Sequence, residues 1–506
     1  MQSQINSKNQ SDTVNIFLKR GDTWQVNTIS STLSHITFPA NGPIVHVNAY
    51  GLGNSRPVID GMVADWNNVP YDGTGGIRRW NTIFRVEFND CSVKNLEIRN
   101  YYGNAIHLQA VESFTMAGNY IHGFGSCAIA EQARGITSGC TIAHNIVHTG
   151  QLLRKYNKRD AGWDGALNIK TDNGTKPHHI HHNIVYDICG EGILTSNSLV
   201  EWNLVGDTGS VGISNVPHDF DSYNAVIRYN LILNSSDFSN YGISGQEATA
   251  IRLMDELPAG SNEFGTFEYY GNVIINRHFG LHQHINKAQG CYDPFKWAKV
   301  YNNLFIDSVN CNLGVFDPDN YLDYVNVYNN SSLLIKRTNG FHAKDGGKLP
   351  HSDWTITGNH FWTKGQSTPT VPSAWKGNWN IKDPQLLGQD TVNWTSLTGP
   401  NYWRAINPIK HLNPPSSSPI HNLNPVLTLD IDKFIKEIED YHLKGSSQTV
   451  LPGDFNGDNK VNTLDYEIMK TEFFKVLPSY KADMNGKDGV NDLDYELFRR
   501  EFGKKK

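Results

Sequence analysis

Residues 141–149 read TIAHNIVHT, a phrase in which Asn145 stands between two groups of β-forming residues. The phrase recurs as HIHHNIVYD (179–187), LVEWNLVGD (199–207) and VIRYNLILN (226–234). Its central asparagines are Asn119, Asn145, Asn183, Asn203, Asn230, Asn272, Asn303 and Asn359, with weaker copies at Asn95 and Asn330. The copies follow one another about every 29 residues, so the chain is built from an internal repeat.

A unit of this length is too short to bury its apolar face alone, so successive copies must stack. The residues around each asparagine are β-branched and aromatic, turns of Gly, Asn and Asp separate the copies, and helical periodicity is nearly absent. These features predict an all-β fold, a right-handed parallel β-helix solenoid of about ten coils. We expect the asparagines to lie at one corner of the coils and to form a ladder of side-chain amides, which is a structural rather than a catalytic role.

The two ends of the repeat region carry their own signals. The opening IFLKRGDTWQV (16–26) and the phrase SSSPIHNLNP (416–425) resemble the first and last coils of secreted, pectate-lyase-like β-helix proteins that act on carbohydrates. This resemblance covers residues 14–425 and is specific for fold and not for reaction. We expect the β-helix domain to span residues 1–425. Residues 426–450 are expected to form a capping segment and linker, because apolar residues between 431 and 441 follow helical spacing. A degenerate terminal strand is the alternative for this segment.

A second repeat occupies the C-terminal region, where GDFNGDNKVNTLDYE (453–467) is followed 29 residues later by ADMNGKDGVNDLDYE (482–496). Each copy places oxygen-bearing side chains at the spacing of a calcium loop, and oxygen atoms are the ligands that Ca²⁺ prefers. The expected ligands are Asp454, Asn456, Asp458, the backbone carbonyl of Lys460, Asn462 and Asp465 in the first loop, and Asp483, Asn485, Asn491 and Asp494 in the second.

Two such loops, each followed by Leu-Asp-Tyr-Glu and a helical stretch, resemble a type I dockerin. The resemblance makes residues 451–506 a small α-helical, EF-hand-like module, with Ca²⁺ as cofactor and a cohesin-type protein as partner. A calcium-stapled tail without a partner is the alternative. The second loop departs from the pattern at its fifth position, where Lys487 replaces a carboxylate and Asp488 is displaced by one residue. We therefore expect one strong calcium site and one weak or empty site.

A further phrase accompanies each asparagine phrase, with a small residue and an apolar residue followed by alternation, as in NAIHLQ (104–109) and GALNIK (165–170). Because alternate residues of a strand face outward, these phrases predict an outer column rich in His, Lys and Arg. Insertions at 151–164, 233–249, 255–267 and 285–297 flank the middle of the column and predict a groove long enough for a polymer. The expected outward residues are His107, Asn168, Lys170, Ser214, Arg252, His282, His284, His342 and Lys344.

The candidate catalytic residues on this face are Lys170, Glu191, Asp219, Arg252, Asp255 and His282. A polysaccharide lyase needs a base to remove the proton beside a uronate carboxylate, and a cation to neutralise that carboxylate. A glycoside hydrolase needs two carboxyl groups across the scissile bond. Both sets of groups are present, so the reaction type stays open. The phrase VPHDF (216–220) resembles the Asp-Pro-His-Asp phrase of alginate epimerases, but Val216 replaces its first Asp.

The leading hypothesis is an extracellular or cell-surface enzyme that cleaves glycosidic bonds in a polysaccharide and is attached to a partner through the dockerin-like module. The alternatives are a non-catalytic carbohydrate-binding or surface-display protein, and a uronan C5-epimerase.

The composition argues against two other classes of protein, nucleic-acid-binding proteins and membrane-spanning proteins. The net charge of −6 and the lack of a long basic run argue against nucleic-acid binding, and no stretch has the apolar length of a membrane span. The polar residues 1–12 contain no signal-peptide core. Six scattered cysteines without a CxxC pair are expected to be small buried residues.

Overall fold

The structure is a computed structural model, and it describes most of the β-helix. Of the residues singled out above, Asp219, nearly all of the segment 426–450 and every expected calcium ligand lie outside the described residues. The described residues are 1–29, 34–51, 55–69, 81–131, 137–156, 165–170, 176–215, 225–235, 248–255, 266–285, 297–315, 325–337, 341–344, 355–366, 369–372, 375, 383–385, 415–418, 436 and 463.

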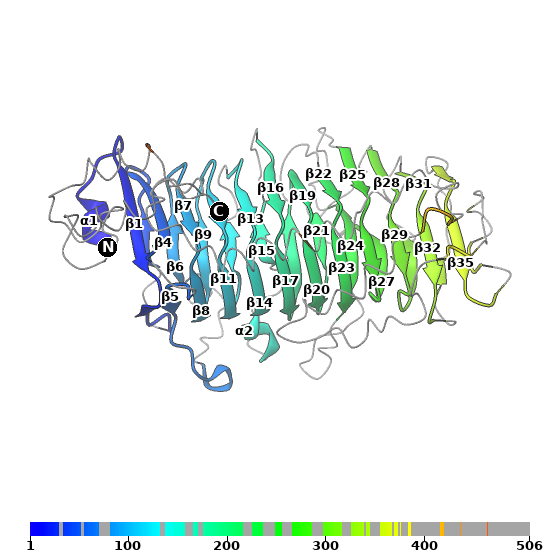
Figure 1. Cartoon of the computed structure of the whole chain (residues 1–506), viewed down its shortest axis with the longest axis horizontal. Coiled ribbons are helices and arrows are strands. Elements are labelled where there is room, and N and C mark those ends of the chain that lie inside the picture. Colours follow the sequence, from blue (N-terminus) through cyan, green and yellow to red (C-terminus); the bar gives the residue numbers. More distant parts are fainter. Residues whose placement is uncertain are drawn as a thin grey trace.

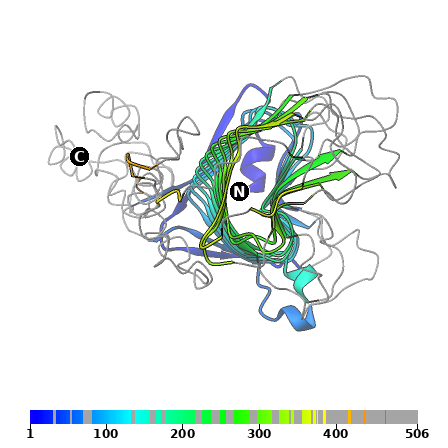
Figure 2. The same cartoon turned by 90° about the vertical axis from the view of Figure 1, so that its right-hand side faces the viewer.

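The described strands form three long sheets that run along the molecule (Figures 1 and 2). The first sheet holds β1 (Thr13–Lys19), β4 (Ile44–Tyr50), β7 (Ser92–Lys94), β10 (Thr115–Ala117), β13 (Thr141–Ala143), β16 (His178–His181), β19 (Ser198–Glu201), β22 (Ala225–Arg228), β25 (Thr266–Tyr270), β28 (Trp297–Tyr301), β31 (Val325–Tyr328) and β34 (Thr355–Thr357). The second holds β2 (Thr23–Gln25), β5 (Val58–Asp60), β8 (Glu97–Tyr101), β11 (Tyr120–Phe124), β14 (Ile146–Gly150), β17 (Ile184–Ile188), β20 (Leu204–Thr208), β23 (Leu231–Ser235), β26 (Val273–Ile275), β29 (Leu304–Ile306), β32 (Ser331–Leu334) and β35 (His360–Thr363). The third holds β3 (Ser34–Phe38), β6 (Thr82–Val86), β9 (Asn104–Leu108), β12 (Ile129–Glu131), β15 (Gly165–Ile169), β18 (Glu191–Thr195), β21 (Ile213–Asn215), β24 (Thr249–Asp255), β27 (Phe279–Ile285), β30 (Cys311–Val315) and β33 (Phe341–Lys344).

Each strand pairs in parallel with the strands three before and three after it, so each coil contributes one strand to each sheet. The predicted parallel β-helix is therefore confirmed. The first two sheets hold 12 strands each. The β-helix therefore has two coils more than the asparagine phrase has copies. The two extra coils are the first two, which have Gly21 and Gly51 at the corner where later coils carry the asparagine phrase.

The core lies between the three sheets and consists of columns of aliphatic residues, one residue per coil. In the second sheet such a column runs through Ile121, Val147, Val185, Val205 and Ile232, all fully buried. Helix α1 (Gln2–Asn6) lies at the N-terminal end, where the side chain of its Ile5 joins this core (Figure 2). The remaining described helices are the short η1 (Trp66–Asn68) and α2 (Leu152–Lys155).

The asparagine ladder is confirmed. From Asn119 to Asn330, the side-chain Nδ2 of each ladder asparagine donates to the Oδ1 of the next at 2.9–3.0 Å, and the ladder ends at Asn359. The same Nδ2 also donates to backbone carbonyls, as Asn203 does to Ile180 and Glu201, so this buried amide is well satisfied. The weak copy Asn95 was wrong for the ladder: the backbone N–H of Leu96 donates to Asn119 Oδ1, so Asn95 lies one residue too early.

Left-handed residues flank most ladder asparagines, and the one before the asparagine lies where the chain turns from the first sheet into the second. The residue before it has φ near +55° in His144, His182, Trp202 and Tyr229, while other coils use Gly118, Gly271 and Gly358 there. The residue four positions after it is again left-handed, at Thr149, Asp187, Asp207, Asn234, Asn276 and Asp307. This second column of left-handed residues was not predicted. Its sequence signal is the recurrence of Asp, Asn or Thr four residues after the ladder asparagine, because Asn and Asp tolerate the left-handed conformation.

The five described cysteines, Cys91, Cys127, Cys140, Cys189 and Cys311, are buried free thiols, as expected for them. Burial raises the pKa of the Cys91 thiol to about 11, so it stays protonated and unreactive near neutral pH. Among the described helices, none has the length and apolar composition to cross a membrane.

Candidate functional site

The outer face of the third sheet carries the predicted column in one register. Ten residues occupy equivalent positions on successive strands of this sheet. Six belong to the predicted column, namely His107, Asn168, Ser214, Arg252, His282 and Lys344, and the other four are Arg85, Ala130, Leu194 and Gly314. Their partners in the phrase, such as Leu167 and Ile251, point into the core. The alternation of the short phrases therefore predicted which residues share this face.

His342 was wrongly placed in the outer column. Its side chain is fully buried, with Nδ1 hydrogen-bonded to Ser332 Oγ at 2.8 Å and Nε2 to Thr363 Oγ1 at 2.6 Å. It stands at the position of the small residue of the phrase, which faces the core in the other coils, as Ala250 does. Burial, with a smaller effect of His360, lowers the pKa of His342 strongly, so the imidazole is neutral at pH 7.

Glu191 and Arg252 come together although they lie 61 residues apart. They project from β18 and β24, and Arg252 Nη1 lies 3.5 Å from Glu191 Oε1. We expected Arg252 to line an open groove, but the two side chains are only 3% and 1% exposed. Removing both charges from water is costly. A buried ion pair of this kind therefore depends on how its partners are arranged, and not on the attraction between two solvated surface charges.

Lys170 and His282 lie on the same face on either side of this pair, and both are half-buried. Lys170 follows β15 directly, and its backbone N–H donates to Glu131 Oε2 at 2.9 Å. Arg252 lies three strands further on, as the repeat predicted, and His282 is its register partner on β27. Asp255 is the last residue of β24, and its side chain, like all of Asp219, lies outside the described residues. The described residues thus bring Glu191 and Arg252 into contact, with Lys170 and His282 beside them.

His107 extends the column toward the N-terminus. Burial, assisted by the positive charge of Arg85, lowers the pKa of His107 to about 4. Its imidazole is therefore neutral near pH 7, whereas the neighbouring Arg85 bonds to Glu87 and Gln109 at 2.5 Å. At this end of the face, the Arg85 guanidinium is therefore already hydrogen-bonded to Glu87 and Gln109.

A row of aromatic rings on the outer face of the first sheet was not predicted. Tyr270, Tyr301 and Tyr328 stack on one another at 4.8 and 4.9 Å with interplanar angles of 8° and 4°. Their recurrence two residues before a ladder asparagine is the sequence signal for this row. Because each ring covers the face of the next, the row stabilises the coils and leaves little ring face for stacking on a sugar.

Comparison with known families identifies the C-terminal module. The type I dockerin domain model matches residues 452–503, which confirms the resemblance of the duplicated loops. No curated protein sequence matches the chain.

Several solved structures are similar to this chain at low identity. A mannuronic acid specific polysaccharide family 6 lyase enzyme from human gut microbiota is 12% identical, with a TM-score of 0.44, and the alignment covers 87% of this chain and 96% of that one. The pectate lyase Pel9A is 11% identical, with a TM-score of 0.38, over 68% of this chain and 70% of that one. The tailspike protein of E. coli bacteriophage HK620, in complex with a pentasaccharide, is 11% identical, with a TM-score of 0.41, over 75% of this chain and 60% of that one.

Proposed function

We propose that this chain is an extracellular polysaccharide-cleaving enzyme whose reaction takes place on the outer face of the third sheet. The observation that carries the proposal is the buried Glu191–Arg252 pair, at 3.5 Å, flanked on the same face by Lys170 and His282. Acids and bases held at low exposure against specific charge partners are typical of functional sites. The Arg85–Glu87 pair at the end of the same face is far more exposed, with side-chain exposures of 30% and 22%.

The span of the site suits a polymer rather than a single sugar. Lys170 and His282 belong to coils four strands apart in the third sheet. At about 4.8 Å per strand, their backbones are about 19 Å apart, which is enough for several sugar units. Long inserted segments join the third sheet to its neighbours on both sides, at residues 157–164 and 236–247 before its strands and at 256–265 and 286–296 after them.

The groups present support bond cleavage by acid–base chemistry. In a lyase reaction, the half-buried Lys170 would neutralise a uronate carboxylate while His282 removes the neighbouring proton, and the glycosidic C–O bond breaks as the C=C bond forms. Arg252 is buried against Glu191 and would position its carboxylate. In a hydrolase reaction, Glu191 would act with a second carboxyl group, for which Asp219 and Asp255 are the candidates. Epimerisation would use the same proton abstraction without bond cleavage, and a binding-only protein would need none of these groups.

Incubation of the purified chain with uronate-containing and neutral polysaccharides tests the proposal. We expect cleavage of at least one polymer, read both by ultraviolet absorbance of new double bonds and by reducing ends. New absorbance identifies a lyase, and reducing ends alone identify a hydrolase. Binding without cleavage, or epimerisation alone, would contradict the proposal and favour one of the two alternative functions.

The dockerin domain supplies the second half of the proposed function, attachment to a cohesin-type partner outside the cell. Type I dockerin domains generally bind calcium, and dockerins occur in extracellular, cellulosome-type enzymes. The donor set of the first loop fits Ca²⁺, because Asp454, Asp458 and Asp465 offer hard carboxylate oxygens at loop spacing. The second loop fits less well, since Lys487 brings a positive charge to a ligand position.

Substitution of Asp454 or Asp465 by alanine is expected to unfold the dockerin module, because metal-binding energy is folding energy in so small a domain. Asp483→Ala should cost much less, since its loop is already weakened by Lys487. Calcium titration by calorimetry, with far-ultraviolet circular dichroism to follow the module, measures both effects. As a control, Lys487→Asp should strengthen the second site; equal and strong occupancy of both wild-type loops would contradict this asymmetry.

A further inference from the structure

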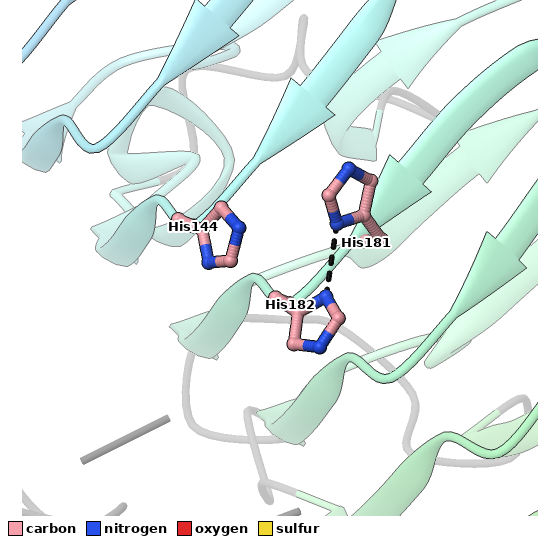
Figure 3. Close-up of side chains that lie close together, drawn as sticks. All are labelled: His144, His181 and His182. Atoms are coloured by element: carbon pink, nitrogen blue, oxygen red, sulfur yellow. Dashed lines mark hydrogen bonds between the residues drawn. The ribbon is translucent and has the colours of Figure 1, made fainter. Parts of the chain in front are cut away.

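Three histidine rings meet on the outer surface where the first sheet turns into the second (Figure 3). His144 follows β13, and His181 and His182 end and follow β16 in the next coil. Each offers a ring nitrogen, and these nitrogens lie within 4.8 Å of one another. All three side chains are half-buried, so the group is held by the coils and still reaches solvent.

The spacing of the rings matches that of three ligands of one tetrahedral metal ion. The ring centroids are 5.3 Å apart for His144 and His181, 5.0 Å for His144 and His182, and 5.1 Å for His181 and His182. With metal–nitrogen bonds of about 2.1 Å and an imidazole ring radius of about 1.1 Å, tetrahedral geometry places ligand centroids about 5.2 Å apart. The observed triangle agrees with this value on all three sides.

The nitrogen atoms point toward the space between the rings (Figure 3). His181 Nδ1 and His182 Nδ1 are hydrogen-bonded to each other at 2.9 Å, and a ring nitrogen of His144 faces them. A bound cation would replace the proton shared by these two nitrogens. The three nitrogens lie within 4.8 Å of one another and would have to approach to about 3.4 Å to share one tetrahedral ion.

The backbone under the three rings is fixed by the ladder. Asn145 Nδ2 donates to Asn183 Oδ1 at 2.9 Å, and the His144 N–H donates to the His181 carbonyl at 3.2 Å. His144 and His182 are left-handed, with φ of +57° and +54°, at a position where three other coils use glycine. Trp202 and Tyr229 take the same left-handed conformation in the following coils, so this corner accepts a ring at the cost of some backbone strain.

A carboxylate group lies near the three histidines, in the next coil. Glu201, the register partner of His181, lies in the next coil, and its carboxylate accepts hydrogen bonds from Arg228 and pairs with His179 at 2.9 Å. The His179 ring lies 4.1 Å from the His181 ring, so this carboxylate is one residue removed from the three histidines. Glu201 therefore reaches the three histidines only through His179, and Arg228 balances its charge.

We propose that His144, His181 and His182 bind one divalent transition-metal ion of the zinc class, with the fourth coordination position left to water. Three imidazoles are a ligand set that suits Zn²⁺ and its neighbours and is unsuited to Ca²⁺, so the site is chemically separate from the calcium loops. The ion joins two consecutive coils at their corner. The site does not depend on the proposed cleavage reaction.

Calorimetric titration of the full-length, untagged chain with ZnCl₂, in excess Ca²⁺ to fill the calcium loops, tests the site. We expect one zinc equivalent per chain, and a Co²⁺ adduct with the intense visible absorption of a four-coordinate site. His144→Gly and His182→Gly should each weaken zinc binding by about 10–100-fold or more. Because glycine relaxes a left-handed position, both variants should unfold at or above the wild-type temperature without metal, which separates lost ligation from lost folding.

His122→Ala is the matched control, since His122 is also half-buried and stacks on His148 at 5.1 Å, but among the described residues it belongs to no group of three possible metal ligands. Its zinc affinity should equal that of the wild type. A wild-type chain that binds zinc no tighter than about 1 mM, or glycine variants that bind it as tightly as the wild type, would overturn the proposal. So would an equal loss in His122→Ala, because binding would then be a diffuse property of surface histidines.

Discussion

Replacing Lys170 by methionine is expected to lower turnover of the cleaved polysaccharide by about 10²–10⁴-fold, the usual effect of removing a positioned acid, base or charge-stabilising group. Lys170 is half-buried on the proposed reaction face, and methionine keeps most of its length without the charge. The thermal midpoint should change little, because no buried charge loses its partner. Initial rates with the polymer found in the polysaccharide screen, together with a melting curve, measure both quantities.

Lys344→Met is the matched control for this change. Lys344 is exposed and belongs to the same outer column, but it lies six coils from Lys170, on β33. Its substitution should leave the rate unchanged. Full activity in Lys170→Met, or an equal loss in Lys344→Met, would move the reaction away from the middle of this face.

Substitution of Arg277 by methionine should reduce the free energy of unfolding by about 3–5 kcal/mol, the usual cost of breaking a buried charged network. The Arg277 side chain is fully buried, and its Nη2 donates to the carbonyls of Ser210 at 2.7 Å and Thr249 at 2.9 Å. Its Nη1 donates to the carbonyl of Asn234. Methionine would leave three buried carbonyls in neighbouring coils without these donors. Urea denaturation followed by circular dichroism measures the change.

Arg337→Met is the control for Arg277. Arg337 is only half-buried and donates through Nη2 to Asn276 Oδ1, so its loss should cost less than about 1 kcal/mol.

Asp207, which feels the charge of Arg277, provides a second check. Burial raises the pKa of Asp207 to about 7, while Arg277 opposes the shift, so this carboxyl should titrate higher still in Arg277→Met. An Arg277 variant as stable as Arg337→Met would show that the buried network contributes little.

The periodic features of this protein could be predicted from the sequence. The recurring asparagine phrase indicated the parallel β-helix and the ladder from Asn119 to Asn359, and alternation placed His107, Arg252 and His282 on one face. The duplicated loops indicated the dockerin domain before any comparison. These features depend on spacing along the chain, which is a local property, because a β-strand alternates its faces every second residue and each coil repeats the last.

Local spacing also explains where these predictions were wrong. Asn95 resembles the ladder residues, but it lies one position early, and a shift of one residue changes what a side chain faces. His342 follows the outer-column pattern, yet it occupies the small-residue position and points into the core. In both cases the short sequence phrase was recognised correctly, but it was aligned with the wrong residues of the neighbouring coil.

Contacts between coils were decided by the tertiary structure alone. The sequence showed Glu191 and Arg252 as candidates, but only the stacking of β18, β21 and β24 places them 3.5 Å apart and buries both. The three histidines behind the proposed metal site come from two consecutive coils, and so do the three carbonyls around Arg277. The inserted segments vary in length, so separation in sequence does not report separation along the axis. Which side chains meet, and which are withdrawn from water, is therefore set by the register between coils and by what covers each face.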